Sequence, residues 1–158
     1  IAAFKPSRVL EIGIGAGYTT MAILQALKFN GYGKLYALDN MMLWAGNEPP
    51  HIKQLRLEGV EVIVADEGEF VKNCQETFDV IIADGDHVNS HKWIDKHLQM
   101  CPNGFLFIHD VSNKDLPNLA AITEYVKGQG IPHFVFRASS RPDERCERGW
   151  LMVATCMK

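Results

Sequence analysis

The sequence has 158 residues, 47% of them apolar, which is enough to bury one core without disulfides or metal ions. Its formal net charge of −3 argues against a basic surface for nucleic acid. No apolar run approaches the roughly 20 residues that a membrane span needs. We therefore expect a single domain over residues 1–158, with neither a nucleic-acid nor a membrane partner.

The cysteines and the first residues indicate where the protein resides and how it begins. Cys74, Cys101, Cys146 and Cys156 are far apart and form no Cys-x-x-Cys pair, which indicates reduced thiols and a cytoplasmic protein. We expect no signal peptide, because none is recognisable before the first expected strand. Because the chain starts at Ile1 without a methionine, we expect that N-terminal segments of a longer protein are missing.

The first expected strand, Arg8–Ile12, leads directly into a glycine-rich turn. The turn has the pattern Glu-x-Gly-x-Gly-x-Gly, formed by Glu11, Gly13, Gly15 and Gly17. Alternate glycines let the backbone turn tightly and approach a ligand, and the helix expected from Thr19 points its free N–H groups at the same place. Dinucleotide-binding proteins have a third glycine where this chain has Tyr18. The alternative interpretation is an ordinary tight turn between a strand and a helix.

Strands and helices are expected to alternate along the rest of the chain. Further strands are predicted at residues 34–38, 60–64, 78–83, 105–108, 133–138 and 149–155, and helices at 19–29, 51–58, 67–76, 89–100 and 116–127. Residues 139–148 contain Pro142 and are too short for a crossover helix, so the last two strands should be antiparallel. The predicted fold is α/β: a doubly wound, Rossmann-like, mostly parallel seven-stranded sheet with an antiparallel last strand.

Acidic residues follow four of the expected strands. They are Asp39, Asp66 with its neighbour Glu67, Asp84 and Asp110. In open parallel sheets the carboxyl ends of the strands form the ligand crevice, and an acid after the second strand is where nucleotide-binding folds hold a ribose. The alternatives are a solvated strand end for Asp39, a helix N-cap for Asp66 and a turn cap for Asp84.

Two further residues indicate chemistry. A carboxylate inside an apolar strand, as at Glu11, costs several kcal/mol unless it is paired or hydrogen-bonded. His87 follows Asp84 closely, and an imidazole with a pKa of about 6.5 can take a proton from a substrate hydroxyl at neutral pH. The alternative for His87 is that it packs against the turn.

The chain resembles a known family from residue 9 to residue 155. The glycine turn led by Glu11 resembles the first motif of class I S-adenosylmethionine (SAM) methyltransferases. The later residues resemble the small-molecule O-methyltransferases related to macrocin O-methyltransferase and cephalosporin hydroxylase; they are Asp84-Gly85-Asp86-His87, Asp95, Gly104 and His109-Asp110.

The resemblance implies a binding role for each candidate residue. Gly13, Gly15 and Gly17 would hold the methionine part of SAM, and Glu11 would position the glycine loop and the amino group of the cofactor. Asp39 would bind the ribose, and Asp66 with Glu67 the adenine amino group. Asp84 would lie beside the sulfonium, and His87 would act as the base.

Asp84 and Asp110 also suggest a metal site. They follow neighbouring strands, and two like charges at short range repel. Either one carboxylate takes up a proton, or a cation such as Mg²⁺ neutralises both, which is the interpretation that we carry forward. Metal-dependent relatives have a further acid or amide where this chain has Val111, so only Asn113 or His109 is left to complete the ligand set.

Together these residues predict a SAM-dependent methyltransferase that acts on an oxygen of a small-molecule acceptor. One alternative is an NAD-dependent oxidoreductase, which Tyr18 and the antiparallel last strand oppose. Another is a SAM-binding module without catalytic activity of its own. The acceptor and the oligomeric state are left open.

Overall fold

The computed structural model describes residues 1–113, 115–137 and 148–155. Within these ranges the chain forms seven strands: β1 (Arg8–Ile12), β2 (Lys34–Asp39), β3 (Glu61–Val64), β4 (Val80–Ala83), β5 (Phe105–His109), β6 (His133–Arg137) and β7 (Gly149–Ala154). In the same ranges it forms five α-helices and two short 3₁₀ helices: α1 (Tyr18–Asn30), α2 (Pro50–Leu57), α3 (Glu67–Asn73), α4 (Ile94–Met100), α5 (Pro117–Gly128), η1 (Met42–Trp44) and η2 (Ser90–Trp93).

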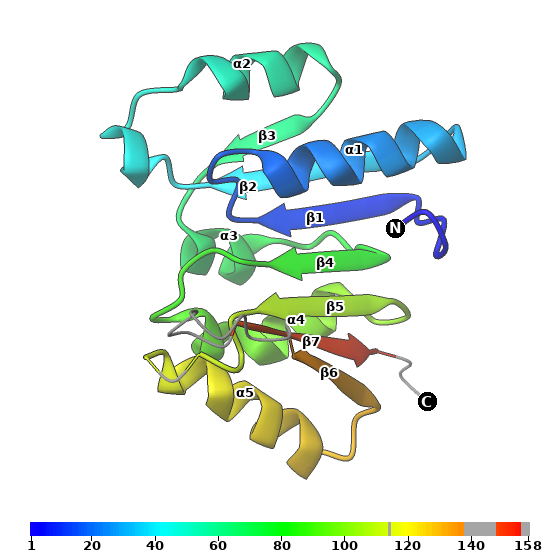
Figure 1. Ribbon diagram of the computed structural model, residues 1–158, viewed down its shortest axis with the longest axis vertical. Helices are drawn as coiled ribbons and strands as arrows, with labels where there is room; N and C mark the ends of the chain where they lie inside the picture. The colour runs from blue at the N-terminus through cyan, green and yellow to red at the C-terminus, as the bar shows by residue number, and fades with distance from the viewer. Residues whose placement is uncertain (114, 138–147, 156–158) are drawn as a thin grey trace.

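The strands form one sheet with the order β3-β2-β1-β4-β5-β7-β6 (Figure 1). The first five strands of the sequence run parallel, whereas β7 is antiparallel to both β5 and β6. This arrangement confirms the predicted doubly wound, Rossmann-like sheet with an antiparallel last strand. Ile12 lies beside Leu38 on one side and Ala83 on the other, so β1, β2 and β4 end level with one another at one edge.

Helices cover the two faces of the sheet and bury two apolar layers. On one face, α1 and α2 pack on β1 and β2 through residues such as Leu24 and Ile52. On the other face, α3, α4 and α5 pack on the same sheet through residues such as Val71, Met100 and Ile122. The central strands are buried on both faces, as expected for parallel strands with continuous apolar sequences.

Two helices differ from the sequence prediction. The helix predicted over residues 67–76 ends at Asn73, where the side-chain amide donates to the carbonyl of Glu69 and Cys74 turns extended. The helix predicted over 89–100 is divided into η2 and α4. Side-chain bonds from Asp86 and Ser90 to nearby backbone groups compete with regular helical bonds at its start. The predicted end of β6 at Ala138 lies outside the described residues.

The predicted acids lie at one end of the sheet, because they follow parallel strands whose carboxyl ends are on the same side. In Figure 1 the arrowheads of β1, β4 and β5 point the same way, and the loops that follow them hold the candidate site. None of the helices in the described ranges has the length and apolar character required to cross a membrane.

Gly104 lies directly before β5, at the end of the sheet where the parallel strands begin. A Cβ at this position would lie 1.9 Å from the carbonyl oxygen of Asp79 and 2.9 Å from the sulfur of Cys101. Gly104→Ala should therefore lower the free energy of unfolding by about 1–3 kcal/mol, since backbone has to move. Urea denaturation measures the change.

Gly128, the last residue of α5, is the matched control because a Cβ there meets no atom within 4 Å. Gly128→Ala should leave stability unchanged or raise it by up to about 1 kcal/mol. Equal stability of Gly104→Ala and the native protein would show that this contact does not constrain the sheet.

Candidate functional site

A crevice of about 670 Å³ opens at the carboxyl edge of the sheet. Its volume lies within the range of about 300–1,000 Å³ that is usual for small-molecule sites. Seven of the predicted site residues line it: Gly13, Gly15, Asp39, Asp66, Glu67, Asp84 and His87. The crevice therefore brings together most of the residues singled out in the sequence.

The other three predicted residues lie beside or beneath the crevice. Glu11 is buried within β1, Gly17 precedes α1 as its N-cap, and Asp110 is buried just after β5. The rim of the crevice also contains three exposed apolar side chains, Met42, Leu43 and Val88.

The glycine turn is shaped by two different requirements. Gly13 has φ = 91°, and a Cβ there would lie 2.3 Å from the carbonyl oxygen of Asp84, so only glycine allows β1 and β4 to end this close together. Gly15 has φ = 51° with open space around it, and it faces the crevice. The turn at Gly13 is thus required by packing, whereas Gly15 leaves room for a ligand.

Asp39 holds the glycine turn from the end of β2. One carboxylate oxygen accepts hydrogen bonds from the backbone N–H groups of Ile14 (2.9 Å) and Gly15 (3.2 Å), and the other accepts from Met41 N–H (2.7 Å). A carboxylate can accept about four hydrogen bonds, so this one retains capacity for a ligand hydroxyl. The solvated strand end that was the alternative for Asp39 is not what the structure shows.

Asp66 is the N-cap of α3. Its Oδ1 accepts a hydrogen bond from the backbone N–H of Glu69 at 3.0 Å, which is the alternative considered from the sequence. Because Asp66 also lines the crevice, capping does not prevent it from contacting a ligand.

Glu11 is fully buried, and neither of its carboxylate oxygens has a hydrogen-bond partner among the described residues. Burial raises the pKa of Glu11 to about 8; the nearby Thr20 hydroxyl opposes this shift, and the charges of Asp84 and Asp39 add to it. The side chain is therefore mostly protonated at pH 7. A buried acid without a partner costs stability and marks a site that a ligand can satisfy.

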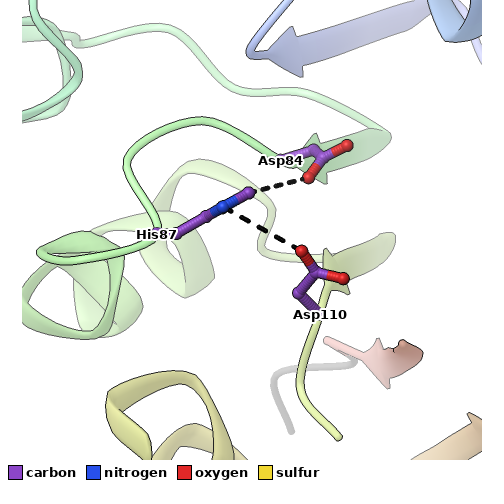
Figure 2. A group of neighbouring side chains, drawn as sticks. All are labelled: Asp84, His87 and Asp110. Carbon is purple, nitrogen blue, oxygen red and sulfur yellow. Dashed lines mark hydrogen bonds and ion pairs between the residues drawn. The ribbon is translucent and has the colours of Figure 1, made fainter. Parts of the chain in front are cut away.

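Two histidines lie between the carboxylates that follow β4 and β5. Asp84 Oδ1 is 3.0 Å from His87 Nε2 and 2.9 Å from His109 Nδ1. His87 Nδ1 lies 3.9 Å from Asp110 Oδ2, so the His87 ring stands between the two acids (Figure 2). The His109 ring also packs on Trp150 of β7, with ring centroids 4.4 Å apart.

These contacts set the charges of the cluster. Partial burial alone would raise the pKa of Asp84, but hydrogen bonds from His109 and His87 outweigh it and lower the pKa to about 2. The pKa of His87 is raised, chiefly by its hydrogen bond to Asp84, with the charge of Asp110 contributing. At neutral pH the cluster thus contains an ionised Asp84 next to an imidazole that holds its proton more strongly than usual.

Asp110 is the most constrained residue of the cluster. It is 3% exposed, has φ = 59° although it is not glycine, and its Oδ1 has no hydrogen-bond partner within the described part of the chain. Val111 is buried, and the Asn113 side chain accepts a hydrogen bond from Asp115 N–H. Of the two substitute ligands considered from the sequence, only His109 lies in the cluster.

The structure shows a way of separating the charges of Asp84 and Asp110 that was not considered from the sequence, because two imidazole rings lie beside these carboxylates. The sequence suggested either a shared proton or a cation between the carboxylates, but two histidine rings occupy the space around Asp84. His87 was already a candidate, whereas His109 was considered only as a ligand. Its place at the end of a buried strand, directly before Asp110, was the available signal.

Comparison with protein-family models matches residues 10–111 to a family described as a methyltransferase domain. No curated protein matches the sequence. The structure resembles O-methyltransferase TomG of Streptomyces achromogenes, involved in tomaymycin synthesis and solved with SAM, with a TM-score of 0.76, 14% identity, and coverage of 99% of this chain and 76% of TomG.

Two further solved structures are similar. The O-methyltransferase of Bacillus cereus in complex with S-adenosylhomocysteine (SAH) has a TM-score of 0.76 and 18% identity, over 97% of this chain and 76% of the other. An rRNA methylase of Streptococcus thermophilus has a TM-score of 0.67 and 19% identity, over 99% of this chain and 94% of the other. At these identities the likeness establishes a shared fold, and the fold accommodates more than one class of acceptor.

The unpartnered Glu11 predicts a distinctive pH dependence of stability. With a pKa of about 4.5 unfolded and about 8 folded, this acid is protonated in both states below pH 4.5. Between the two values only the unfolded state loses the proton, so stability falls by about 1.4 kcal/mol per pH unit as pH rises, until the loss is complete above pH 8.

Glu11→Gln removes this ionisation and should make the ligand-free protein more stable than native at pH 7–9, with little difference at pH 4. Thermal denaturation followed across this pH range is the measurement, and Glu69→Gln, at an exposed site, is the control. If the stability of Glu11→Gln depends on pH in the same way as that of Glu69→Gln and the native protein, Glu11 is ionised in the folded protein and its pKa is not raised.

Proposed function

The chain belongs to the methyltransferase-domain family, and we propose that it transfers a methyl group from SAM to an oxygen of a small-molecule acceptor. The observation that carries this proposal is the crevice in which the glycine turn, Asp39, Asp66 and Asp84 converge. The family match, residues 10–111, covers all of these residues. When bound, SAM supplies a methyl group activated on a positively charged sulfonium.

The residues of the crevice fit the different parts of SAM. Asp39 retains capacity to accept a hydrogen bond from a ribose hydroxyl, and Gly15 leaves the backbone open to the methionine part. Asp84 is ionised at neutral pH, which favours a sulfonium in the crevice. The buried carboxyl group of Glu11, in β1 just before the turn, makes no hydrogen bond among the described residues, and an amino group of the ligand can stabilise its charged form.

His87 is the residue that we assign as the base. With Nε2–H donating to Asp84, the other ring nitrogen, Nδ1, retains its lone pair and can take the proton of an acceptor hydroxyl. The Asp84 carboxylate orients the ring and stabilises the imidazolium that results. Because Asp84 raises the pKa of His87, the neutral form of the base increases as the pH rises above 6.5.

A small-molecule acceptor is supported by the chemistry of the crevice and of the whole chain. The apolar side chains of Met42, Leu43 and Val88 line the rim, and the net charge is −3. Both features suit a partly apolar small molecule better than a nucleic acid. Among the described residues Cys74 and Cys101 form no disulfide, which supports a cytoplasmic location because cytosolic thiols stay reduced; Cys146 and Cys156 lie outside those residues.

We also propose that Asp84 and Asp110 hold a divalent cation such as Mg²⁺, with His87 as a neighbour. One ligand atom from each of these three residues lies within 4.8 Å of the other two. The buried Asp110 Oδ1 makes no hydrogen bond in the described residues, although His109 Nδ1 lies 3.5 Å and Arg148 Nε 3.9 Å from it. A divalent cation at this site would compete with these two groups for the carboxylate. Such a cation would lower the pKa of an acceptor hydroxyl bound to it.

Calorimetry with SAM, SAH and NAD⁺ in separate titrations tests the proposed cofactor. We expect micromolar binding of SAM and SAH and no binding of NAD⁺, because Tyr18 replaces the third glycine of dinucleotide-binding turns. Binding of NAD⁺ in preference to SAM would favour the oxidoreductase. SAM binding without turnover on any acceptor would favour a binding module.

Asp39→Ala should weaken SAM binding at least tenfold, since hydrogen bonds to a charged acceptor contribute about 1.5–3 kcal/mol. Asp79→Ala is the matched control: Asp79 also accepts two backbone N–H bonds, from Ser7 and Arg8, but at the opposite edge of the sheet. The control should bind SAM like the native protein. Equal affinities of all three proteins would remove Asp39 from the site.

Titration of EDTA-treated protein with MgCl₂ tests the cation directly, without an acceptor. Native protein should bind Mg²⁺ at one site, and Asp110→Asn should weaken this binding at least tenfold because a hard anionic ligand is lost. Asp115→Asn, at an exposed position beyond the cluster, serves as the control. No binding by native protein would leave His87 as an unassisted base.

A further inference from the structure

The loop that carries Asp84 and His87 rests on a buried carboxylate that comes from another element. Glu67 is the first residue of α3 and is 6% exposed, although its neighbours Asp66 and Glu69 are exposed. Its Oε2 accepts a hydrogen bond from the backbone N–H of Asp86 at 3.0 Å. A buried side chain of α3 thus holds the middle of the loop between β4 and η2.

Two further buried polar residues surround this carboxylate. The hydroxyl oxygen of Ser90, in η2, lies 3.1 Å from both Glu67 oxygens and 2.6 Å from the carbonyl oxygen of Asp86. His97, in α4, is 1% exposed, and its Nε2 lies 3.4 Å from Glu67 Oε1. Glu67 therefore contacts η2 at hydrogen-bond distance and α4 through the nearby His97 ring, which makes no hydrogen bond to it among the described residues.

The loop and η2 pack closely against the first turn of α3. A Cβ at Gly85 would lie 2.9 Å from both Glu67 Oε2 and the Ile12 side chain. A Cβ at Gly68 would lie 2.6 Å from the Trp93 ring. The loop is pressed against Glu67 on one side, and α3 is pressed against η2 on the other, so a shift of the carboxylate has to move the loop.

The remaining part of the loop is held together internally. The Asp86 carboxylate accepts hydrogen bonds from the backbone N–H groups of Val88 and Asn89 and from the Asn89 side chain. Residues 86–89 consequently form one hydrogen-bonded unit. Contacts with the rest of the fold hold this unit: Glu67 accepts from Asp86 N–H, His87 bonds to Asp84, and the Asn118 side-chain amide donates to the carbonyl of Val88 at 3.3 Å.

We propose that Glu67, supported by Ser90 and His97, is a positioning residue that keeps His87 between Asp84 and Asp110. This assigns Glu67 a role distinct from the predicted adenine contact. The consequence for methyl transfer rests on the proposed function. The positioning itself does not, so it is measured on protein without cofactor or acceptor.

Residue-resolved hydrogen exchange of the ligand-free protein tests the contact. In Glu67→Ala, the amide of Asp86 should exchange at least tenfold faster than in the native protein, while amides of β4 and β5 keep their rates. Glu67→Gln should retain most of the protection, because its amide oxygen still accepts from Asp86 N–H. Glu69→Ala, an exposed position on the same helix, should change neither.

Crystal structures of Glu67→Ala and Glu67→Gln test the position of His87. We expect the His87–Asp84 hydrogen bond to be lost in the alanine variant and kept in the glutamine variant. Native-like protection of Asp86 in Glu67→Ala, an unmoved His87, or faster exchange throughout the sheet would each overturn the proposal. If Glu67→Ala does not fold, Ser90→Ala takes its place, with an expected several-fold faster exchange at Asp86.

Discussion

The close approach of β1 and β4 is the constraint on which the site depends. At Gly13 the two strand ends come so near that any Cβ would overlap the carbonyl group of Asp84. The glycine turn and the loop with the catalytic candidates are therefore side by side because the backbones pack, before any ligand contributes. Asp39 then fixes the turn through the backbone N–H groups of Ile14 and Gly15, so both walls of the crevice are preorganised.

Two acids near the carboxyl ends of the parallel strands differ in ionisation at neutral pH: Glu11 is mostly protonated and Asp84 is ionised. Burial raises the pKa of Glu11 although the Thr20 hydroxyl opposes the shift, whereas hydrogen bonds from two imidazoles lower the pKa of Asp84. The two carboxyl groups thus differ both in burial and in partners, since Glu11 is fully buried whereas Asp84 is partly exposed and accepts from two imidazoles. Within the methyltransferase-domain family, this difference suits a crevice that receives a positively charged ligand on an anionic wall.

Much of this arrangement was predictable because it follows from strand periodicity. The apolar runs predicted the strands, and the rule that parallel strands share one carboxyl edge predicted that Asp39, Asp66 and Asp84 meet. Side-chain contacts across the fold were not predictable in the same way. The second hydrogen bond on Asp84, from His109, and the burial of Glu67 against Asp86 depend on rotamers and on how α3 and α4 pack, for which the sequence has no periodic signal.

The place of β7 in the sheet has a consequence for how the protein is made. β6 precedes β7 in the sequence, but β7 lies between β5 and β6 and its Trp150 packs on His109. During synthesis at about 5–20 residues per second, β6 leaves the ribosome before the strand that it pairs with exists. For this interval one edge of β5 and both edges of β6 are unpaired, which exposes them to wrong pairing and to chaperones.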